Sequence, residues 1–158
     1  VGEVQRLTAR TVVGYHSQVL VDQGVAVEIF VLDAPVAGDG DEERQRGGPG
    51  PLRAAIGNAV GKALYDLYGR GPARTRVYLA DDVVLCALED PLTTVEQTLA
   101  EGGRTDLVRR LRRGFVRASA ARLEADVQAL VERPVVACQS QVVFDPDILF
   151  LTFLLAAR

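Results

Sequence analysis

The strongest constraint on the fold is an internal repeat. Residues 4–34 can be laid without gaps on residues 127–157, at an offset of 123, and thirteen of the paired positions are identical. About two identities would be expected by chance for unrelated segments of this length. A chain that carries two copies of one segment should build two related supersecondary units, one near each end. The identical positions include Val12, Val13, Ser17, Gln18, Val19, Asp22 and Phe30, which match Val135, Val136, Ser140, Gln141, Val142, Asp145 and Phe153.

Each copy of the repeat reads as the end of a helix followed by two strands. Apolar residues dominate both strand-like stretches, and Asp22-Gln23-Gly24 or Asp145-Pro146-Asp147 separates them. Such residues supply the backbone angles and side-chain caps that a chain reversal requires, so the sequence predicts a hairpin in each copy. The four strands are expected over 12–21, 25–32, 135–144 and 148–155.

The segment between the copies begins with a stretch that has no apolar period. Residues 36–50 are rich in glycine and charge, which is typical of a flexible, solvated linker. Pro51 then opens a helix expected over Leu52–Tyr68, because proline suits a first turn and Gly69 provides the usual stop. Three parts are therefore expected: 1–35 as the closing hairpin portion of an incomplete first copy, 36–50 as the linker, and 51–158 as a complete domain.

The expected complete domain contains a further hairpin and two further helices. Alternating polar and apolar residues predict strands over Arg74–Ala80 and Val83–Glu89. Thr93 and Glu96 form a capping box that opens a short helix, and Gly102-Gly103 ends it.

A long helix over Thr105–Val131 leads into the second copy of the repeat. The resulting order, α-β-β-α-α-β-β from Leu52 to Ala157, is typical of an α+β domain with helices on an antiparallel or mixed sheet. The N-terminal hairpin is additional to it. The buried stripe of the long helix is expected at i, i+4 spacing: Leu107, Leu111, Phe115, Ser119, Leu123, Val127 and Leu130.

Residue types that commonly carry catalysis or bind metals are sparse. The only histidine, His16, lies in an expected strand and is replaced by Gln139 in the sister copy, which favours a structural role. Cys86 and Cys138 lie in apolar stretches, where free thiols usually behave as small buried hydrophobic residues. The histidine and the two cysteines do not have the spacing of zinc ligands, so we expect no metal. We also expect no catalytic residue and no cofactor.

Arginines form two candidate binding features. Arg70 and Gly71 lie in a Gly-Arg-Gly-Pro turn, which is either a tight connector or an anion-binding turn. Arg109, Arg113 and Arg117 follow one line of the long helix, where like charges repel. This basic face is either solvated or a docking surface for an acidic partner, a membrane surface or nucleic acid. Arg104, Arg110 and Arg112 extend it.

Residues 67–96 resemble the MpsC-like family of bacterial proteins. The motifs that carry the resemblance are Tyr68–Pro72, Arg76-Val77-Tyr78, Val83–Leu88 and Leu92–Glu96. The resemblance covers Leu52–Ala157, and residues 27–33 look like the end of another domain of this kind. It implies a tandem protein linked to a sodium-translocating, membrane-potential-generating system, and it brings no catalytic residues.

The sequence as a whole indicates a non-catalytic accessory or regulatory binding module. A net charge of −3 is not that of a protein that gains its affinity by neutralising phosphates. No apolar run is long enough to span a membrane, so we expect a cytoplasmic protein, or one peripheral to the inner face of the membrane. Its expected partner is a protein, such as a membrane transport component, or a second copy of the chain. The alternative is an RNA- or nucleotide-binding domain that uses the Gly-Arg-Gly-Pro turn, Arg76 and the arginine-rich helix.

The N-terminal hairpin carries a row of apolar side chains, Val25, Val27, Ile29 and Val31. Exposed apolar strand edges invite pairing. We therefore expect this hairpin to pack like a missing half-domain, either on the complete unit or across a dimer.

Overall fold

The computed structural model describes residues 1–20, 22, 24–33 and 50–157. The chain divides into two compact units, Val1–Arg46 and Gly47–Arg158. The linker expected over 36–50 lies outside the described residues except for Gly50, which begins a helix.

The second unit has the predicted order of elements, which confirms the α+β class. Its first helix starts two residues earlier than predicted, because Gly50 and Pro51 occupy a first turn whose N–H groups need no partner within the helix. The elements are α3 (Gly50–Tyr68), β3 (Arg74–Ala80), β4 (Val83–Glu89), α4 (Thr94–Glu101), α5 (Thr105–Val131), β5 (Val135–Phe144) and β6 (Asp147–Leu155).

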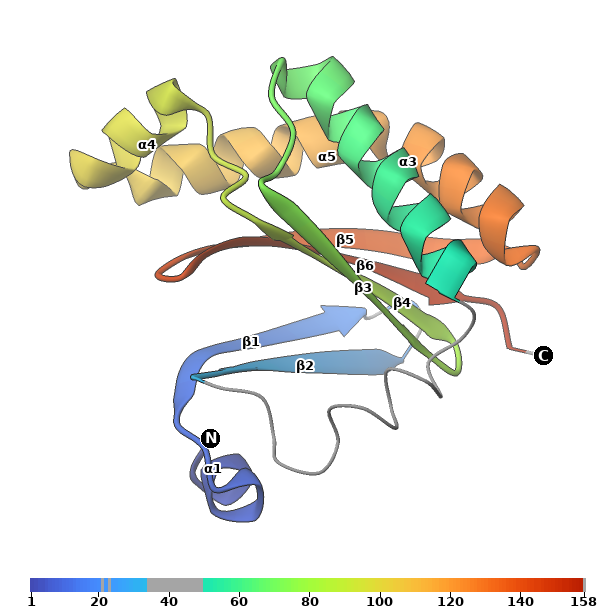
Figure 1. Cartoon of the computed structure of the whole chain (residues 1–158), viewed down its shortest axis with the longest axis horizontal. Coiled ribbons are helices and arrows are strands. Elements are labelled where there is room, and N and C mark those ends of the chain that lie inside the picture. Colours follow the sequence, from blue (N-terminus) through green and yellow to red (C-terminus); the bar gives the residue numbers. More distant parts are fainter. Residues whose placement is uncertain (21, 23, 34–49, 158) are drawn as a thin grey trace. The chain divides into compact units, whose positions relative to one another are not determined.

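The strands of the second unit form one antiparallel sheet in the order β3-β4-β6-β5. The sheet consists of two hairpins, β3–β4 and β5–β6, which join through their second strands. Residues Val83–Glu89 of β4 pair with Ile148–Leu154 of β6 over the whole length of β4. Helices α3, α4 and α5 all lie on one face of this sheet (Figure 1).

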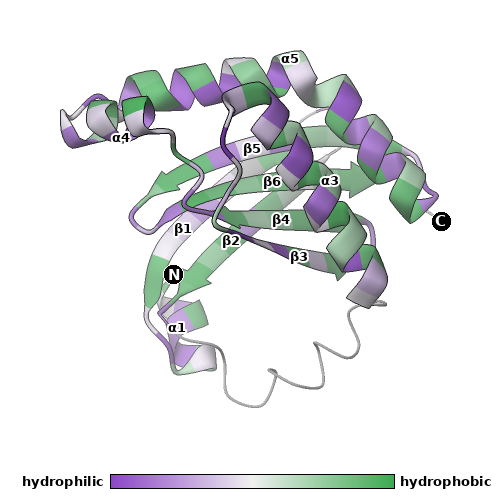
Figure 2. Ribbon diagram, turned by 45° about the horizontal axis from the view of Figure 1, so that its top comes forward, coloured by the Kyte–Doolittle hydropathy of each residue, from purple (hydrophilic) through white to green (hydrophobic). Residues whose placement is uncertain are grey.

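Strand β6 is the centre of the core. It is paired on both sides, and its long apolar run suits a strand that is buried in the middle of a sheet. Leu149, Leu151 and Phe153 are fully buried and belong to one cluster with Ile56 of α3 and Leu123 of α5. Apolar residues accordingly follow the central strands β4 and β6 (Figure 2).

The buried face of α5 differs from the prediction in the first half of the helix. Leu111 and Phe115, both expected in the buried stripe, are 45% and 37% exposed. The stripe was misplaced because Arg112 occupies a core position, whereas pattern reasoning assigns arginine to solvent. The side chains buried instead are Val108, Arg112, Val116, Leu123 and Val127.

The first unit contains a short helix and the predicted hairpin. Helix α1 (Gly2–Thr8) precedes the antiparallel strands β1 (Val12–Leu20) and β2 (Val25–Leu32). The last residue expected in the first strand, Val21, lies outside the described residues.

The hairpins of the two units share their main-chain register. After the offset of 123, all eight paired positions of β1–β2 coincide with paired positions of β5–β6. The register shift lies at the same place in both, between Val12 and Gly14 in the first hairpin and between Val135 and Ala137 in the second. A shared irregularity of this kind shows that the repeat fixes local geometry as well as strand positions.

The entry into each hairpin is also shared. The helix ends at a left-handed residue, Ala9 with φ 52° in the first unit and Glu132 with φ 54° in the second. A glutamine side chain then accepts a hydrogen bond from the first strand residue. The Val12 N to Gln5 Oε1 distance is 3.2 Å, and the Val135 N to Gln128 Oε1 distance is 3.0 Å.

Truncation of Phe153 should test the central position of β6. We expect Phe153→Ala to lower the free energy of unfolding by about 3–5 kcal/mol, because it leaves a cavity in a fully buried site. Val136→Ala, at a 42% exposed position of β5, should cost less than about 1 kcal/mol. Urea denaturation measures both, and similar losses for the two variants would contradict this description of the core.

Candidate functional site

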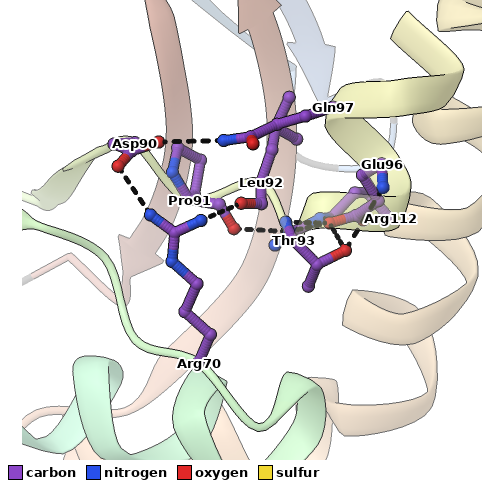
Figure 3. Close-up of polar contacts among 8 residues, drawn as sticks. All are labelled: Arg70, Asp90, Pro91, Leu92, Thr93, Glu96, Gln97 and Arg112. Carbon is purple, nitrogen blue, oxygen red and sulfur yellow. Dashed lines mark hydrogen bonds and ion pairs between the residues drawn. The ribbon is translucent and has the colours of Figure 1, made fainter.

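A cluster of charged side chains lies where the end of α3, the connection from β4 to α4, and α5 come together (Figure 3). Two carboxylates and two guanidinium groups form its centre. They belong to Asp90, Glu96, Arg70 and Arg112, and Asp147 adjoins them at the start of β6.

The capping box of α4 positions Glu96. The Thr93 hydroxyl accepts a hydrogen bond from Glu96 N at 3.3 Å, and Glu96 Oε2 accepts one from Thr93 N at 2.8 Å. This reciprocal arrangement confirms the predicted capping box. It also places an ionisable residue that is only 2% exposed in the first turn of the helix.

Arg112 of α5 meets this carboxylate with two hydrogen bonds. Its Nε lies 2.6 Å from Glu96 Oε1, and its Nη2 lies 2.5 Å from Glu96 Oε2. Nη2 also donates to the Pro91 carbonyl oxygen at 2.5 Å. The side chains of Arg112 and Glu96 are 1% and 3% exposed, so the ion pair is shielded from water. Bidentate geometry and an extra carbonyl acceptor are what a buried guanidinium requires.

Tyr68, at the end of α3, covers the ion pair on one side. The Arg112 guanidinium carbon lies 3.9 Å from the centroid of the Tyr68 ring, within the range of a cation–π interaction. Phe115 packs edge-on against the same ring at a centroid distance of 5.2 Å. Burial raises the pKa of Tyr68, and its buried hydroxyl has no hydrogen-bond partner among the described residues.

The ion pair controls the charge state of Glu96. Burial alone would raise the pKa of Glu96, but the hydrogen bonds from Arg112 and Thr93 outweigh it and hold the pKa below its usual value. Glu96 therefore stays ionised at neutral pH, with its negative charge directly against the guanidinium.

Arg70 ties the turn after α3 to the turn after β4. Its Nη2 donates to Asp90 Oδ2 and its Nη1 to the Leu92 carbonyl oxygen, each at 2.6 Å. Gln97 Nε2 contacts the other Asp90 oxygen at 3.4 Å (Figure 3). Arg70 thus has a structural role in this cluster.

Asp147 is the least satisfied member of the cluster. Its main-chain oxygen accepts a hydrogen bond from Asp90 N at 3.1 Å, but its buried Oδ1 has no partner among the described residues. Burial raises the pKa of Asp147 to about 6, and the charge of Asp90 adds to the effect. With Asp147 protonated, the remaining carboxylates of Asp90 and Glu96 balance the charges of Arg70 and Arg112.

The structure separates the residues singled out in the sequence. Arg70 joins the buried cluster, and Arg76 forms an ion pair with Glu89 at 2.6 Å. Gly71 lies beside α3, where an added Cβ would meet the Gly61 carbonyl oxygen at 3.9 Å, an ordinary contact. The side chains of Arg70 and Arg76 therefore both have partners within the fold.

The arginines of α5 fall into two groups. In the first group, Arg110 pairs with Asp106, Arg112 with Glu96 and Arg122 with Asp66, and Arg104, at the N-cap, also lies near Asp106. Arg109 lies over the Phe144 ring, with its guanidinium carbon 4.9 Å from the ring centroid. In the parts of the chain that the structure describes, the exposed Arg113 and Arg117 form no ion pair within 4 Å.

Two contributors to the buried cluster were missed by sequence reasoning. Arg112 was grouped with the exposed basic face, although Val108 and Val116, one turn to either side, give a signal that its position is buried. Asp147 was treated only as a turn residue, and no sequence signal places it near Asp90, because 57 residues separate them.

A shallow hollow of about 590 Å³ lies at the other end of the sheet, around the β3–β4 turn. Arg133 borders it and donates to Asp82 Oδ1 at 2.5 Å and to the Ala156 carbonyl oxygen. These contacts fix the end of the chain to the turn. Among the described residues, no group of three His, Cys, Asp or Glu side chains is arranged to hold a metal ion.

Loss of Arg112 should be costly. We expect Arg112→Met to lower the free energy of unfolding by about 3–5 kcal/mol, because it leaves the Glu96 carboxylate buried without a counter-charge. The double variant Arg112→Met/Glu96→Gln should recover part of that loss. Arg110→Met, which breaks an exposed pair with Asp106, should cost less than about 1 kcal/mol. Urea denaturation distinguishes these outcomes, and equal effects of the two single variants would contradict the buried pair.

Asp147 should make stability depend on pH. Its folded-state pKa of about 6 exceeds the value of about 3.9 for an unfolded aspartate, so the protonated form is favoured in the folded state. The stability that protonated Asp147 contributes is fully present below about pH 4 and is lost as the pH rises through about 6. Asp147→Asn should therefore stabilise the protein at pH 7.5, by about 1 kcal/mol after allowance for partial exposure, and not at pH 4.

Asp145→Asn provides the control, because it removes the same charge from an exposed position of the same turn. Thermal or urea unfolding at the two pH values measures the difference. A gain for Asp147→Asn that is equal at both pH values would show that its ionisation is not responsible.

Comparisons with known proteins identify the second unit. The model of the family described as "Na+-translocating membrane potential-generating system (MpsC)" matches residues 49–157. No curated protein and no solved structure matched the chain. No helix among the described residues is long and apolar enough to cross a membrane. The match includes every element from β3 to β6 and the charged cluster around Arg112, and the chain therefore belongs to the MpsC family.

Proposed function

We propose that the chain is a non-catalytic accessory module that binds an acidic surface on a component of a membrane-potential-generating system. The family name supplies the association with that system. The binding surface is the outer face of α5 that carries Arg113 and Arg117, with Arg109 at its border. The module would act from the cytoplasm, at the inner face of the membrane.

The observation that carries this proposal is the pair of exposed, unneutralised arginines one turn apart on α5. Like charges at this spacing repel by a few tenths of a kcal/mol, and the described part of the chain offers neither of them a carboxylate. Nearby arginines of the same helix are each paired or stacked on an aromatic ring. An acidic partner would relieve the repulsion and gain two charge-assisted contacts.

The buried ion pair supports this surface mechanically. Arg112 precedes Arg113 directly and is held by Glu96, by the Pro91 carbonyl oxygen and by Tyr68. This stretch of α5 is therefore held in place before a partner binds, so binding would order little additional backbone. Preorganised surfaces bind with a smaller entropic cost.

The alternative, an RNA- or nucleotide-binding domain, depends on the Gly-Arg-Gly-Pro turn together with the arginines of α5. Arg70 already donates to Asp90 and Leu92, and Arg76 is paired with Glu89. A nucleic-acid ligand would have to displace these partners, whereas Arg113 and Arg117 need no such exchange. The acidic protein surface is therefore our preferred partner.

We also infer that the first unit corresponds to the closing third of a second MpsC-type domain. This inference is supported by the shared strand register, the shared irregularity and the shared glutamine contact at the entry to both hairpins.

Charge reversal on α5 tests the binding surface. The immobilised full chain would be incubated with detergent-solubilised, nuclease-treated membranes of the source organism. We expect Arg113→Glu/Arg117→Glu to lose a membrane protein that the unmodified chain retains, at least tenfold, because two attractive contacts become repulsive. Retention should also fall as ionic strength rises.

Arg104→Glu/Arg110→Glu is the matched control. It changes the net charge by the same amount at the start of the same helix, but at residues that lie near Asp106. This control should retain the membrane protein. Equal retention by both double variants would reject the α5 surface. Capture that is seen only when the nuclease treatment is omitted, accompanied by tight heparin binding, would favour the nucleic-acid alternative.

A further inference from the structure

The outer flank of α5 lies above one edge of the sheet of the MpsC domain. Helix α5 covers β5, the last strand of the order β3-β4-β6-β5, and α3 covers the opposite side (Figures 1 and 2). On α5, Arg122 pairs with α3, whereas Arg109 stacks on Phe144 at the end of β5. Arg113 and Arg117 lie further round the helix than Arg109, away from α3, because successive residues are about 100° apart. They therefore lie on the side of α5 that overhangs the outer edge of β5.

The two edges of this sheet differ in how they are protected. Edge strands commonly carry charged residues or prolines that discourage pairing. β3 has Arg74 and Arg76, but β5, VVACQSQVVF, has no charged residue and no proline. The irregularity of β5 lies at its start, between Val135 and Ala137, and the rest of the strand is regularly paired with β6. The regular part of β5 is thus suited to receiving a further strand.

The charges above this edge indicate what kind of strand fits it. Arg113 and Arg117 are exposed, and no carboxylate of the described residues pairs with them. They are about 6 Å apart along the helix axis. Side chains at alternate residues of a strand project from the same face about 7 Å apart. A strand with carboxylates at alternate positions would therefore place one near each arginine.

We propose that the acidic partner adds an extended segment to the outer edge of β5 as a fifth strand, with alternate carboxylates directed to Arg113 and Arg117. This inference rests on the proposed function, because it uses the same arginines, and it adds the conformation of the partner. Main-chain hydrogen bonds to β5 would supply affinity that is independent of side chains. The arginines would select an acidic sequence.

A synthetic peptide tests strand addition on the full chain. The probe is a capped, fluorescent peptide of about seven residues, a usual strand length, in which glutamate and valine alternate. We expect fluorescence anisotropy to show binding that weakens at least tenfold when the amides along one edge of the peptide are N-methylated, because the N–H donors are lost without a change in charge. Methylation along its other edge should have little effect. Arg113→Glu/Arg117→Glu should also weaken binding at least tenfold.

Proline substitution tests the same edge on the protein. Neighbouring residues of a strand direct their N–H groups to opposite edges, so one of Gln139→Pro and Ser140→Pro removes an outward N–H and the other removes a bond to β6. The variant that circular dichroism shows to be folded should bind the peptide at least tenfold more weakly. Thr75→Pro and Arg76→Pro form the matched pair on β3, and their folded member should bind it normally.

The possible results separate strand addition from the proposed function. Loss of binding in the arginine double variant, with no effect of N-methylation or of the folded β5 proline variant, would leave the acidic surface standing and reject strand addition. Failure of the peptide to bind at about 1 mM would also overturn the proposal. If the unmodified chain sediments as a dimer that the folded β5 proline variant dissociates, a second copy occupies the edge and the proposal is wrong. If both β5 proline variants unfold, the comparison of the methylated peptides decides.

Discussion

The bidentate contact between Arg112 and Glu96 is the interaction on which the arrangement of the MpsC domain depends. Both groups are almost fully buried, and neither is tolerable there without the other. Glu96 is fixed by the first turn of α4 and Arg112 by the second and third turns of α5, so the pair sets how these helices cross. Tyr68 extends the same constraint to α3. The guanidinium group of Arg112 thereby contacts residues of two other helices, Glu96 of α4 and Tyr68 of α3.

Burial of Arg112 also determines which side chains of α5 face solvent. A helix that places one arginine in the core turns its immediate neighbours outward, because successive residues lie about 100° apart around the axis. Arg113 and Arg117 therefore lie on the outside, while Phe115 flanks the core beside Tyr68. The inward and outward arginines of α5 thus have opposite physical roles. Arg112 stabilises the fold through a dehydrated pair, whereas Arg113 and Arg117 keep their charges available to a partner.

Local signals in the sequence were enough to predict most elements of the fold. Turn residues marked each hairpin, and the Thr93 and Glu96 capping box marked the start of α4 within one residue. The site was less predictable, because its parts come together only through long-range packing. Arg112 breaks the rule that charged residues face solvent, so the apolar pattern around it pointed to the wrong stripe. Asp147 reaches the cluster only because β6 pairs with β4, a contact that no local pattern reveals.

Comparison of the two copies of the repeat shows which structural features follow from the repeated segment itself and which depend on the strands beside it. Register, irregularity and the glutamine contact recur in both hairpins, so they follow from the segment itself. The outer pairing of the second strand does not, because in the MpsC domain it is supplied by β4, which precedes the repeat in the chain. Where Leu151 lies in the doubly paired strand, the first copy has Glu28. The main-chain geometry of the hairpin is therefore encoded in the repeated segment, whereas the further pairing of its second strand depends on a strand outside that segment.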